Sequence, residues 1–213
     1  MSAMAPDEKR LRADAERNRR RVLDAAAALF SERGLDVGVG EIAESAGVGR
    51  ATLFRNFACK EDLISAIVVD RMNDAGDRGR VLLDAEDPVE ALFQFLDELV
   101  GRQQLDRALF EAVSDAWLAN DAIREAHAEF LGVVDQLLAR AKETGEVRDD
   151  VGPMDVLMLF KGVCESASAF AHVDPEIIGR HLDLVRAALS TSAAKPLRGR
   201  EPSLRDVELS ARG

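Results

Sequence analysis

The chain has 213 residues, of which 47% are apolar and 31% charged, and its formal net charge is −11. This composition excludes a disordered chain, and abundant alanine and leucine with no tyrosine and only six prolines favour an all-α fold. Residues 1–65 hold 11 basic and 11 acidic groups, whereas residues 66–213 hold 17 basic and 28 acidic groups. Because an acidic surface repels DNA, we expect any DNA contact to be confined to the N-terminal part.

Several classes of protein find no support in the sequence. Cys59 and Cys164 form no CxxC motif, and the three histidines are widely spaced, so we expect no disulfide, metal or cofactor. The first 20 residues are charged throughout, unlike a signal peptide, and no apolar run approaches the ~18 residues of a membrane span, which predicts a cytoplasmic protein. Enzyme motifs such as GxSxG, a P-loop or HExxH are also missing, so we predict no enzyme.

Residues 1–12 are polar and predicted to form a disordered arm. A helix is predicted from about Ala13 to a C-terminal cap at Gly34. Its apolar side chains fall at i, i+4, i+7 and i+8, the spacing of one helix face: Val22, Ala26, Leu29 and Phe30.

The next segment predicts two short helices, over 39–46 and 50–56, joined by a tight turn at Ala46-Gly47-Val48. The apolar residues that would hold them together are Ile42, Ala43, Val48, Leu53 and Phe57. No acidic residue occurs from Ser45 to Lys60, although the whole chain is acidic. Two short helices crossed at such a turn can place one helix in a DNA major groove.

The remainder predicts a series of amphipathic helices. A longer helix starts at Lys60, with acidic residues in its first turn that match the helix dipole. Asp87 and Pro88 are typical of a helix start. Further helices are expected over roughly 88–102, 104–119, 121–143, 153–172 and 174–191, and 192–213 are predicted to form a flexible tail.

Residues 19–65 resemble the N-terminal domain of TetR-family transcriptional regulators. The resemblance rests on Leu29-Phe30, Gly34, Ile42-Ala43, Ala46-Gly47-Val48, Thr52-Leu53-Phe54, Phe57, Lys60 and Leu63. It implies an all-α homodimer in which a three-helix helix-turn-helix DNA-binding domain (13–62) precedes a helical ligand-binding and dimerisation domain (63–191). It further implies repression or activation of nearby promoters, relieved by a small molecule. Our hypothesis is a ligand-responsive repressor that binds a palindromic operator as a homodimer.

Four positions depart from the family pattern. Gly38 stands where the family often has a hydroxyl residue, Phe54 replaces a tyrosine, Asn56 a histidine and Cys59 a serine or threonine. Gly38 and Phe54 lack hydroxyls that would contact phosphate, Asn56 can still donate a hydrogen bond, and Cys59 is a poor helix cap. Together these changes weaken the expected contacts with phosphate. They leave an alternative open, a helical interaction protein whose DNA-binding head has lapsed.

The candidate DNA-contacting residues are Arg19, Arg20, Arg50, Ala51, Thr52, Phe54, Arg55, Asn56 and Lys60. Arg50, at the start of the presumed recognition helix, can read a guanine edge through two hydrogen bonds. Lys60 precedes a helix N-terminus and is expected to bind phosphate. For each, the competing interpretation is a solvated surface residue or, for Phe54, partial burial in the core.

In the C-terminal part, an unknown small-molecule effector is expected near Gln103, Trp117, His127 and Phe130, although most apolar residues there must be plain core. Two apolar stripes are predicted to form the dimer interface as a four-helix bundle: Leu157, Phe160, Cys164 and Ala167, and Ile178, Leu182, Val185 and Leu189. The competing interpretation of these stripes is packing within one subunit.

Overall fold

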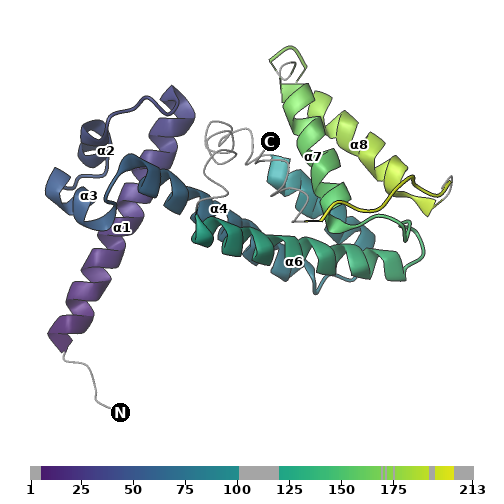
Figure 1. Ribbon diagram of the computed structural model, residues 1–213, viewed down its shortest axis with the longest axis horizontal. Helices are drawn as coiled ribbons and strands as arrows, with labels where there is room; N and C mark the ends of the chain where they lie inside the picture. The colour runs from purple at the N-terminus through teal and green to yellow at the C-terminus, as the bar shows by residue number, and fades with distance from the viewer. Residues whose placement is uncertain are drawn as a thin grey trace. The chain divides into compact units, whose positions relative to one another are not determined.

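The computed structural model describes residues 6–100, 120–168, 170, 172–174, 176–191 and 195–203 (Figure 1). Its helices are α1 (Pro6–Arg33), α2 (Val39–Ser45), α3 (Arg50–Asn56), α4 (Lys60–Leu82), α6 (Asp121–Glu143), α7 (Pro153–Ser168) and α8 (Ile177–Leu189), and residues 88–100 are helical as well. Within these ranges, the β-structure is one isolated bridge between Val147 and Ser190. The all-α prediction is therefore confirmed.

The chain divides into two compact units, and the boundary falls inside α4, between Val68 and Val69. We call the described residues up to Val68 the N-terminal unit and those from Val69 onward the C-terminal unit. The domain boundary predicted from the sequence lies slightly earlier, after residue 62, where the DNA-binding domain was expected to end.

The N-terminal unit is built on α1, α2 and α3, which all contact one another. Helix α1 begins at Pro6, before the expected start near Ala13, since proline suits the first turn of a helix. The side chains that close the core come from all three helices and from the start of α4: Val22, Ala26, Phe30, Ile42, Ala43, Leu53, Phe57, Leu63 and Ile67. Most of the apolar stripe predicted for α1 is thus confirmed as buried.

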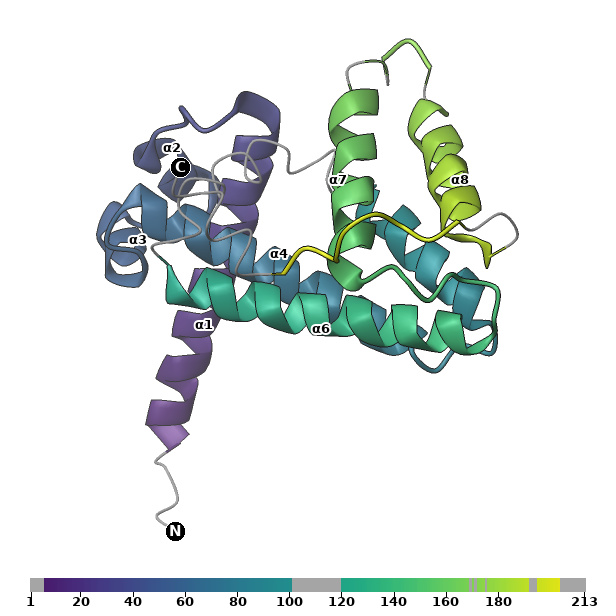
Figure 2. The same ribbon diagram turned by 45° about the vertical axis from the view of Figure 1, so that its right-hand side comes forward.

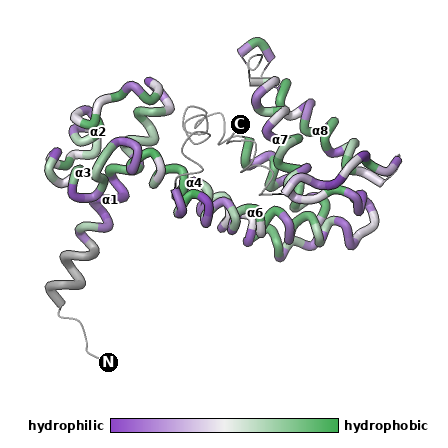
Figure 3. The backbone as a smooth tube through the Cα atoms, in the orientation of Figure 1, coloured by the Kyte–Doolittle hydropathy of each residue, from purple (hydrophilic) through white to green (hydrophobic). Residues whose placement is uncertain are grey.

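The C-terminal unit encloses a larger core between residues 88–100, α6, α7 and α8. Its fully or nearly buried members include Leu92, Phe95, Leu96, Val134, Leu137, Leu138, Val156, Leu182 and Leu189. Figure 3 shows apolar and polar positions interleaved along α6, α7 and α8, the pattern of helices that bury one face. Helices α7 and α8 lie side by side, as both views show (Figure 2).

Two predicted helix starts carry the caps that their sequences indicate. The Asp87 carboxylate accepts hydrogen bonds from the backbone N–H groups of Val89 and Glu90, at 3.0 and 2.9 Å. The Asn120 side chain accepts from Ala122 at 3.0 Å and Ile123 at 3.3 Å. Such caps satisfy N–H groups that have no partner within the helix. The cap predicted at Asp87 is confirmed, and so are the helix starts predicted at 88 and 121.

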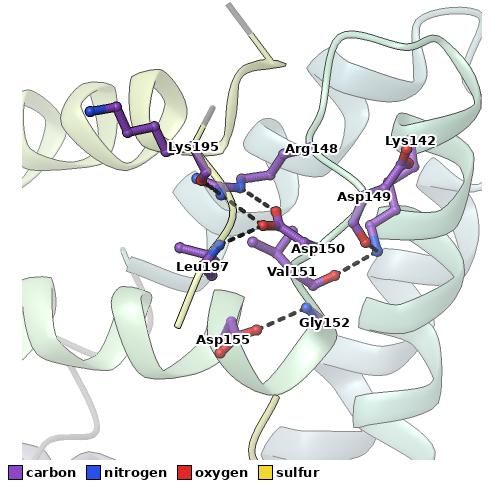
Figure 4. Close-up of polar contacts among 9 residues, drawn as sticks. All are labelled: Lys142, Arg148, Asp149, Asp150, Val151, Gly152, Asp155, Lys195 and Leu197. Carbon is purple, nitrogen blue, oxygen red and sulfur yellow. Dashed lines mark hydrogen bonds and ion pairs between the residues drawn. The ribbon is translucent and has the colours of Figure 1, made fainter. Parts of the chain in front are cut away.

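Residues 195–201, in the predicted flexible tail, make specific contacts with the segment that precedes α7 (Figure 4). Arg148 pairs with Asp150 at 2.5 Å and donates to the carbonyl of Lys195 at 2.8 Å. The N–H of Leu197 donates to the same Asp150 carboxylate at 2.9 Å, and Glu201 accepts from the N–H of Met154 at 3.3 Å. These bonds to Arg148 and Leu197 hold the pKa of Asp150 well below its usual range, and they tie the chain after α8 to the start of α7.

Candidate nucleic-acid interface

The turn between α2 and α3 has the geometry that the sequence predicts. Gly47 adopts φ of +63°, a left-handed conformation that glycine accepts and other residues resist. The N–H of Val48 donates to the carbonyl of Ala43 at 3.0 Å, and an Arg21 guanidinium nitrogen lies 3.5 Å from the Gly47 carbonyl. The turn is thereby closed onto α2 and tied to α1.

Helix α3 presents one exposed face formed by Arg50, Ala51, Phe54 and Arg55. On the opposite side Leu53 is buried in the core. Phe54 is 50% exposed, so about half of this residue is available to contact DNA. Two arginines, a small residue and an exposed ring on an acid-free helix form a surface suited to the phosphates and base edges of DNA.

Thr52 and Asn56 are engaged in bonds local to α3. Arg55 donates to the Thr52 hydroxyl at 2.9 Å, and the Asn56 amide donates to the Thr52 carbonyl at 2.7 Å. Both side chains are half-buried. Each keeps a hydrogen-bonding group for DNA, since the Thr52 hydroxyl can still donate and the Asn56 amide retains a second N–H and its oxygen.

The two predicted arginines of α1 differ in their surroundings. The Arg19 guanidinium stacks over the Phe57 ring, with 4.6 Å from its carbon to the ring centroid, a cation–π contact that holds it beside the end of α3. Arg20 pairs with Asp24 at 3.0 Å on the exposed surface. Surface pairs of this kind contribute little energy, so a phosphate can compete for Arg20.

Lys60 has an internal role that the sequence did not reveal. Its ammonium donates to the Leu35 carbonyl and lies 5.6 Å from the centroid of the buried Phe30 ring. The side chain is half-buried and joins the start of α4 to the loop after α1. A phosphate contact from Lys60 remains a prediction, and it would have to share the ammonium with this loop.

The departures from the family pattern at Gly38 and Cys59 still leave hydrogen bonds between a side chain and the backbone at both helix starts. Gly38 is the N-cap of α2, and its N–H donates to the Glu41 carboxylate at 3.3 Å. Glu41 also pairs with Arg33 at 2.6 Å, and the hydrogen bond from Arg33 lowers the pKa of Glu41. The Cys59 sulfur accepts from the N–H of Asp62 at 3.4 Å, so a thiol fills the place of the usual hydroxyl.

Of the predicted effector contacts, Gln103 and Trp117 lie outside the described residues. Phe130 packs against the core and pairs with Phe95, with 6.0 Å between the ring centroids. A surface groove of about 370 Å³ in the same unit is lined by Val89, Phe93, Glu146, Val147, Asp183, Arg186, Ala187 and Ser190. Neither His127 nor Phe130 lines this groove, and their part in effector binding stays a prediction.

Burial of the His127 ring makes the stability of the fold depend on pH. Desolvation lowers the pKa of His127 from 6.5 to about 4, so the unfolded chain binds a proton before the folded one as the pH falls. The contribution of neutral His127 to the free energy of unfolding is therefore fully present above pH 6.5. This contribution, on the order of 3 kcal/mol, is lost as the pH falls from 6.5 to 4. Urea unfolding across this range should show a shallower decline for His127→Gln than for the unsubstituted protein. Equal declines would contradict the assignment.

Most of the residues predicted for the dimer interface lie in the core of the single subunit. Seven of the eight are buried within the single subunit: Phe160, Cys164, Ala167, Ile178, Leu182, Val185 and Leu189. Leu157 is half-buried against the same core, and burial raises the pKa of the Cys164 thiol to about 12. The physical reason is that α7 and α8 turn these stripes toward each other and toward α6. The exposed apolar side chains on these two helices are instead Met158, Leu159 and Leu184.

Two further properties concern the described residues as a set. Their helices include none that is long and apolar enough to cross a membrane. Across the same residues, the His, Cys, Asp and Glu side chains form no group of three or more that could hold a metal ion.

The N-terminal unit has three helices, a glycine turn between α2 and α3, and an exposed, basic face without acidic residues on α3. These features define the class of helix-turn-helix DNA-binding regulators. Residues 22–67 match the bacterial regulatory proteins of the tetR family, and residues 87–191 match the C-terminal domain of SbtR-like transcriptional regulators. The chain belongs to the TetR family of transcriptional regulators. These proteins are regulators and not enzymes, as the sequence predicts.

Individual relatives agree with this assignment. The chain is 32% identical over 143 residues to the HTH-type transcriptional repressor KstR of Rhodococcus jostii. The matched region covers 66% of this chain and 67% of that protein. A TetR transcription regulatory protein from Mycobacterium vanbaalenii has a crystal structure 35% identical in sequence, with a TM-score of 0.65 over 85% of this chain and 99% of that one. The regulator FadR from Bacillus subtilis, solved in complex with stearoyl-CoA, shares the fold at 19% identity, with a TM-score of 0.60 over 82% and 98% of the two chains.

Proposed function

We propose that this chain is a homodimeric repressor that binds a palindromic operator through α3 and releases it when a small-molecule effector binds the C-terminal unit. The observation that carries the proposal is the exposed face of α3, on which Arg50 and Arg55 stand in a stretch without acidic residues. The surrounding acidic charge disfavours DNA contact elsewhere, so binding is focused on this face.

The remaining parts of the proposal have separate support. Repression follows the relative KstR, whose name is that of a repressor. A dimer is supported by Met158, Leu159 and Leu184, which leave apolar surface exposed on α7 and α8. Two subunits related by a twofold axis would place their α3 helices in half-sites about one helical turn apart.

An apolar effector suits a helical unit whose core is built of aliphatic and aromatic side chains. FadR, of the same fold, holds stearoyl-CoA, so acyl-CoA thioesters are the first compounds to screen for release of DNA. An effector shifts the balance only through unequal affinity for the DNA-binding and released states.

Replacement of Arg50 tests the proposed function. Selection from a randomised DNA pool should yield an operator, and Arg50→Ala should bind it about tenfold more weakly and lose preference at one base pair, because a bidentate contact to guanine is worth about 1–3 kcal/mol. Arg78→Ala, an exposed arginine of α4 in the C-terminal unit, is the matched control and should bind as before.

A salt titration separates this proposal from a lapsed DNA-binding head. Operator affinity should fall steeply on a double-logarithmic plot as counterions compete for phosphate. If the protein shows no sequence-dependent binding even at low salt, the alternative of a helical interaction protein is preferred. The bonds that Thr52, Asn56 and Lys60 make within the chain are the observation that keeps this alternative open.

A further inference from the structure

The side chain of Arg50 lies close to the backbone of α2, although within the described part of the chain no hydrogen bond or ion pair holds it there. Arg50 is the first residue of α3, after the N-cap Gly49, and is exposed. Among the described residues, its guanidinium has no hydrogen-bond or ion-pair partner. A cation at this end of a helix is also disfavoured by the helix dipole. The contact that the guanidinium does make is with the surface beneath it.

That surface is the backbone of α2 at Gly40. A Cβ atom built on Gly40 would lie 2.2 Å from Nη2 of Arg50, 2.9 Å from Cζ and 3.1 Å from Nε. All three distances are shorter than ordinary van der Waals contact, so the guanidinium fills the space that the side chain of any other residue would take. In this arrangement Arg50 reaches back from α3 across the N-terminal turn of α2.

The stability of α2 gives no reason for a glycine at this position. Gly40 is the second residue of the helix and has no unusual φ angle, and glycine inside a helix is destabilising relative to alanine. The contact with Arg50 does give a reason. A flexible arginine can adopt many rotamers. The space left by the missing side chain of Gly40 allows the rotamer in which the guanidinium lies across the α2 backbone.

We propose that Gly40 is a positioning residue for DNA recognition, which sets the base preference of Arg50 by seating its guanidinium against α2. The inference rests on the proposed function. A bidentate contact to guanine depends on the orientation of the planar guanidinium fork, so a change of orientation changes which base is preferred. Gly40 thus contributes to specificity without touching the DNA itself.

A double-mutant cycle tests this inference with Gly40→Ala, Arg50→Ala and the two combined. Gly40→Ala should keep or raise the thermal midpoint, because alanine favours the helix, and the methyl group displaces only the end of a flexible side chain. It should nevertheless bind the selected operator about threefold to tenfold more weakly and change the preference at the same base pair that Arg50→Ala affects. In the Arg50→Ala background, the further change Gly40→Ala should alter neither affinity nor preference.

The outcomes separate this inference from the proposed function. If Arg50→Ala changes the base preference and Gly40→Ala does not, DNA reading by α3 stands and the role of Gly40 is overturned. An equal effect of Gly40→Ala in both backgrounds would also overturn it, since the effect would then not pass through Arg50. If the unsubstituted protein selects no DNA sequence, the proposed function fails and the inference fails with it.

Discussion

A Leu184→Glu variant is expected to be a monomer in solution and to lose nearly all affinity for a palindromic operator. Leu184 is 59% exposed on α8, and Met158, on the adjacent α7, is 55% exposed, so both contribute apolar surface that a second subunit would cover. A glutamate there buries an unpaired charge in the dimer, on a unit that is already acidic. Since linking two DNA-binding sites raises affinity by about 10²–10⁴, monomers should bind the operator at least 100-fold more weakly.

Analytical ultracentrifugation and operator titration measure the two effects together. Val81→Glu, on α4, is the matched control because Val81 is likewise exposed and receives the same charge. Leu184→Met should retain the dimer. The thermal midpoint of Leu184→Glu at low protein concentration should match that of the unsubstituted monomer, because the exposed side chain has few neighbours within its own subunit. A dimer that survives Leu184→Glu would place the interface elsewhere on the molecule.

The candidate dimer surface on α7 and α8 could not be identified from the sequence alone. The periodicity of 153–172 and 174–191 indicates which face of each helix is buried, and that face is indeed buried. Periodicity does not indicate whether a second helix of the same chain or another subunit does the burying. The stripes with Cys164 and Leu182 therefore proved to be core, and the less regular exposed positions became the candidates for the interface.

The N-terminal unit was predictable because its signals are local. A three-residue turn with a left-handed glycine and a short apolar pattern specify α2 and α3 with little help from distant contacts. The environments of individual side chains were less predictable. That Lys60 reaches the Leu35 carbonyl, and that Arg50 lies over Gly40, depends on rotamers and on contacts between residues far apart in the sequence.

In α4, packing outweighs local propensity. The sequence from Asn73 to Gly79 suggests a weakened or bent helix, yet α4 continues to Leu82. The last carbonyls of α4 accept from the backbone N–H groups of the turn that follows the helix. Arg140 from α6 donates to the carbonyls of Leu83 and Ala85 in this turn. The turn after α4 is thus tied to a residue almost 60 positions away.

Close packing around Gly79 explains why a glycine, a weak helix former, occurs at this point of α4. Replacement of Gly79 by valine is expected to destabilise the C-terminal unit strongly. A Cβ on Gly79 would lie 2.5 Å from a Cγ atom of Val133 and 3.0 Å from a ring carbon of Phe95. Both neighbours are almost completely buried, and neither is the end of a flexible side chain, so the helices must separate. Overpacking of this kind typically costs about 1–3 kcal/mol, and we expect Gly79→Val to lie at the upper end.

Gly76, one turn earlier in α4, provides the matched control. It too is buried, but a Cβ there would meet only the end of the Arg80 side chain, at 3.8 Å. Gly76→Ala should therefore stabilise the unit by up to about 1 kcal/mol through helix propensity, whereas Gly79→Ala should destabilise it despite the same gain. In a protein of this size, each 1 kcal/mol shifts the thermal midpoint by about 2–4 °C, so calorimetry resolves the opposite signs. If Gly79→Ala stabilised the protein as much as Gly76→Ala, the close approach of α4 to Val133 and Phe95 would be refuted.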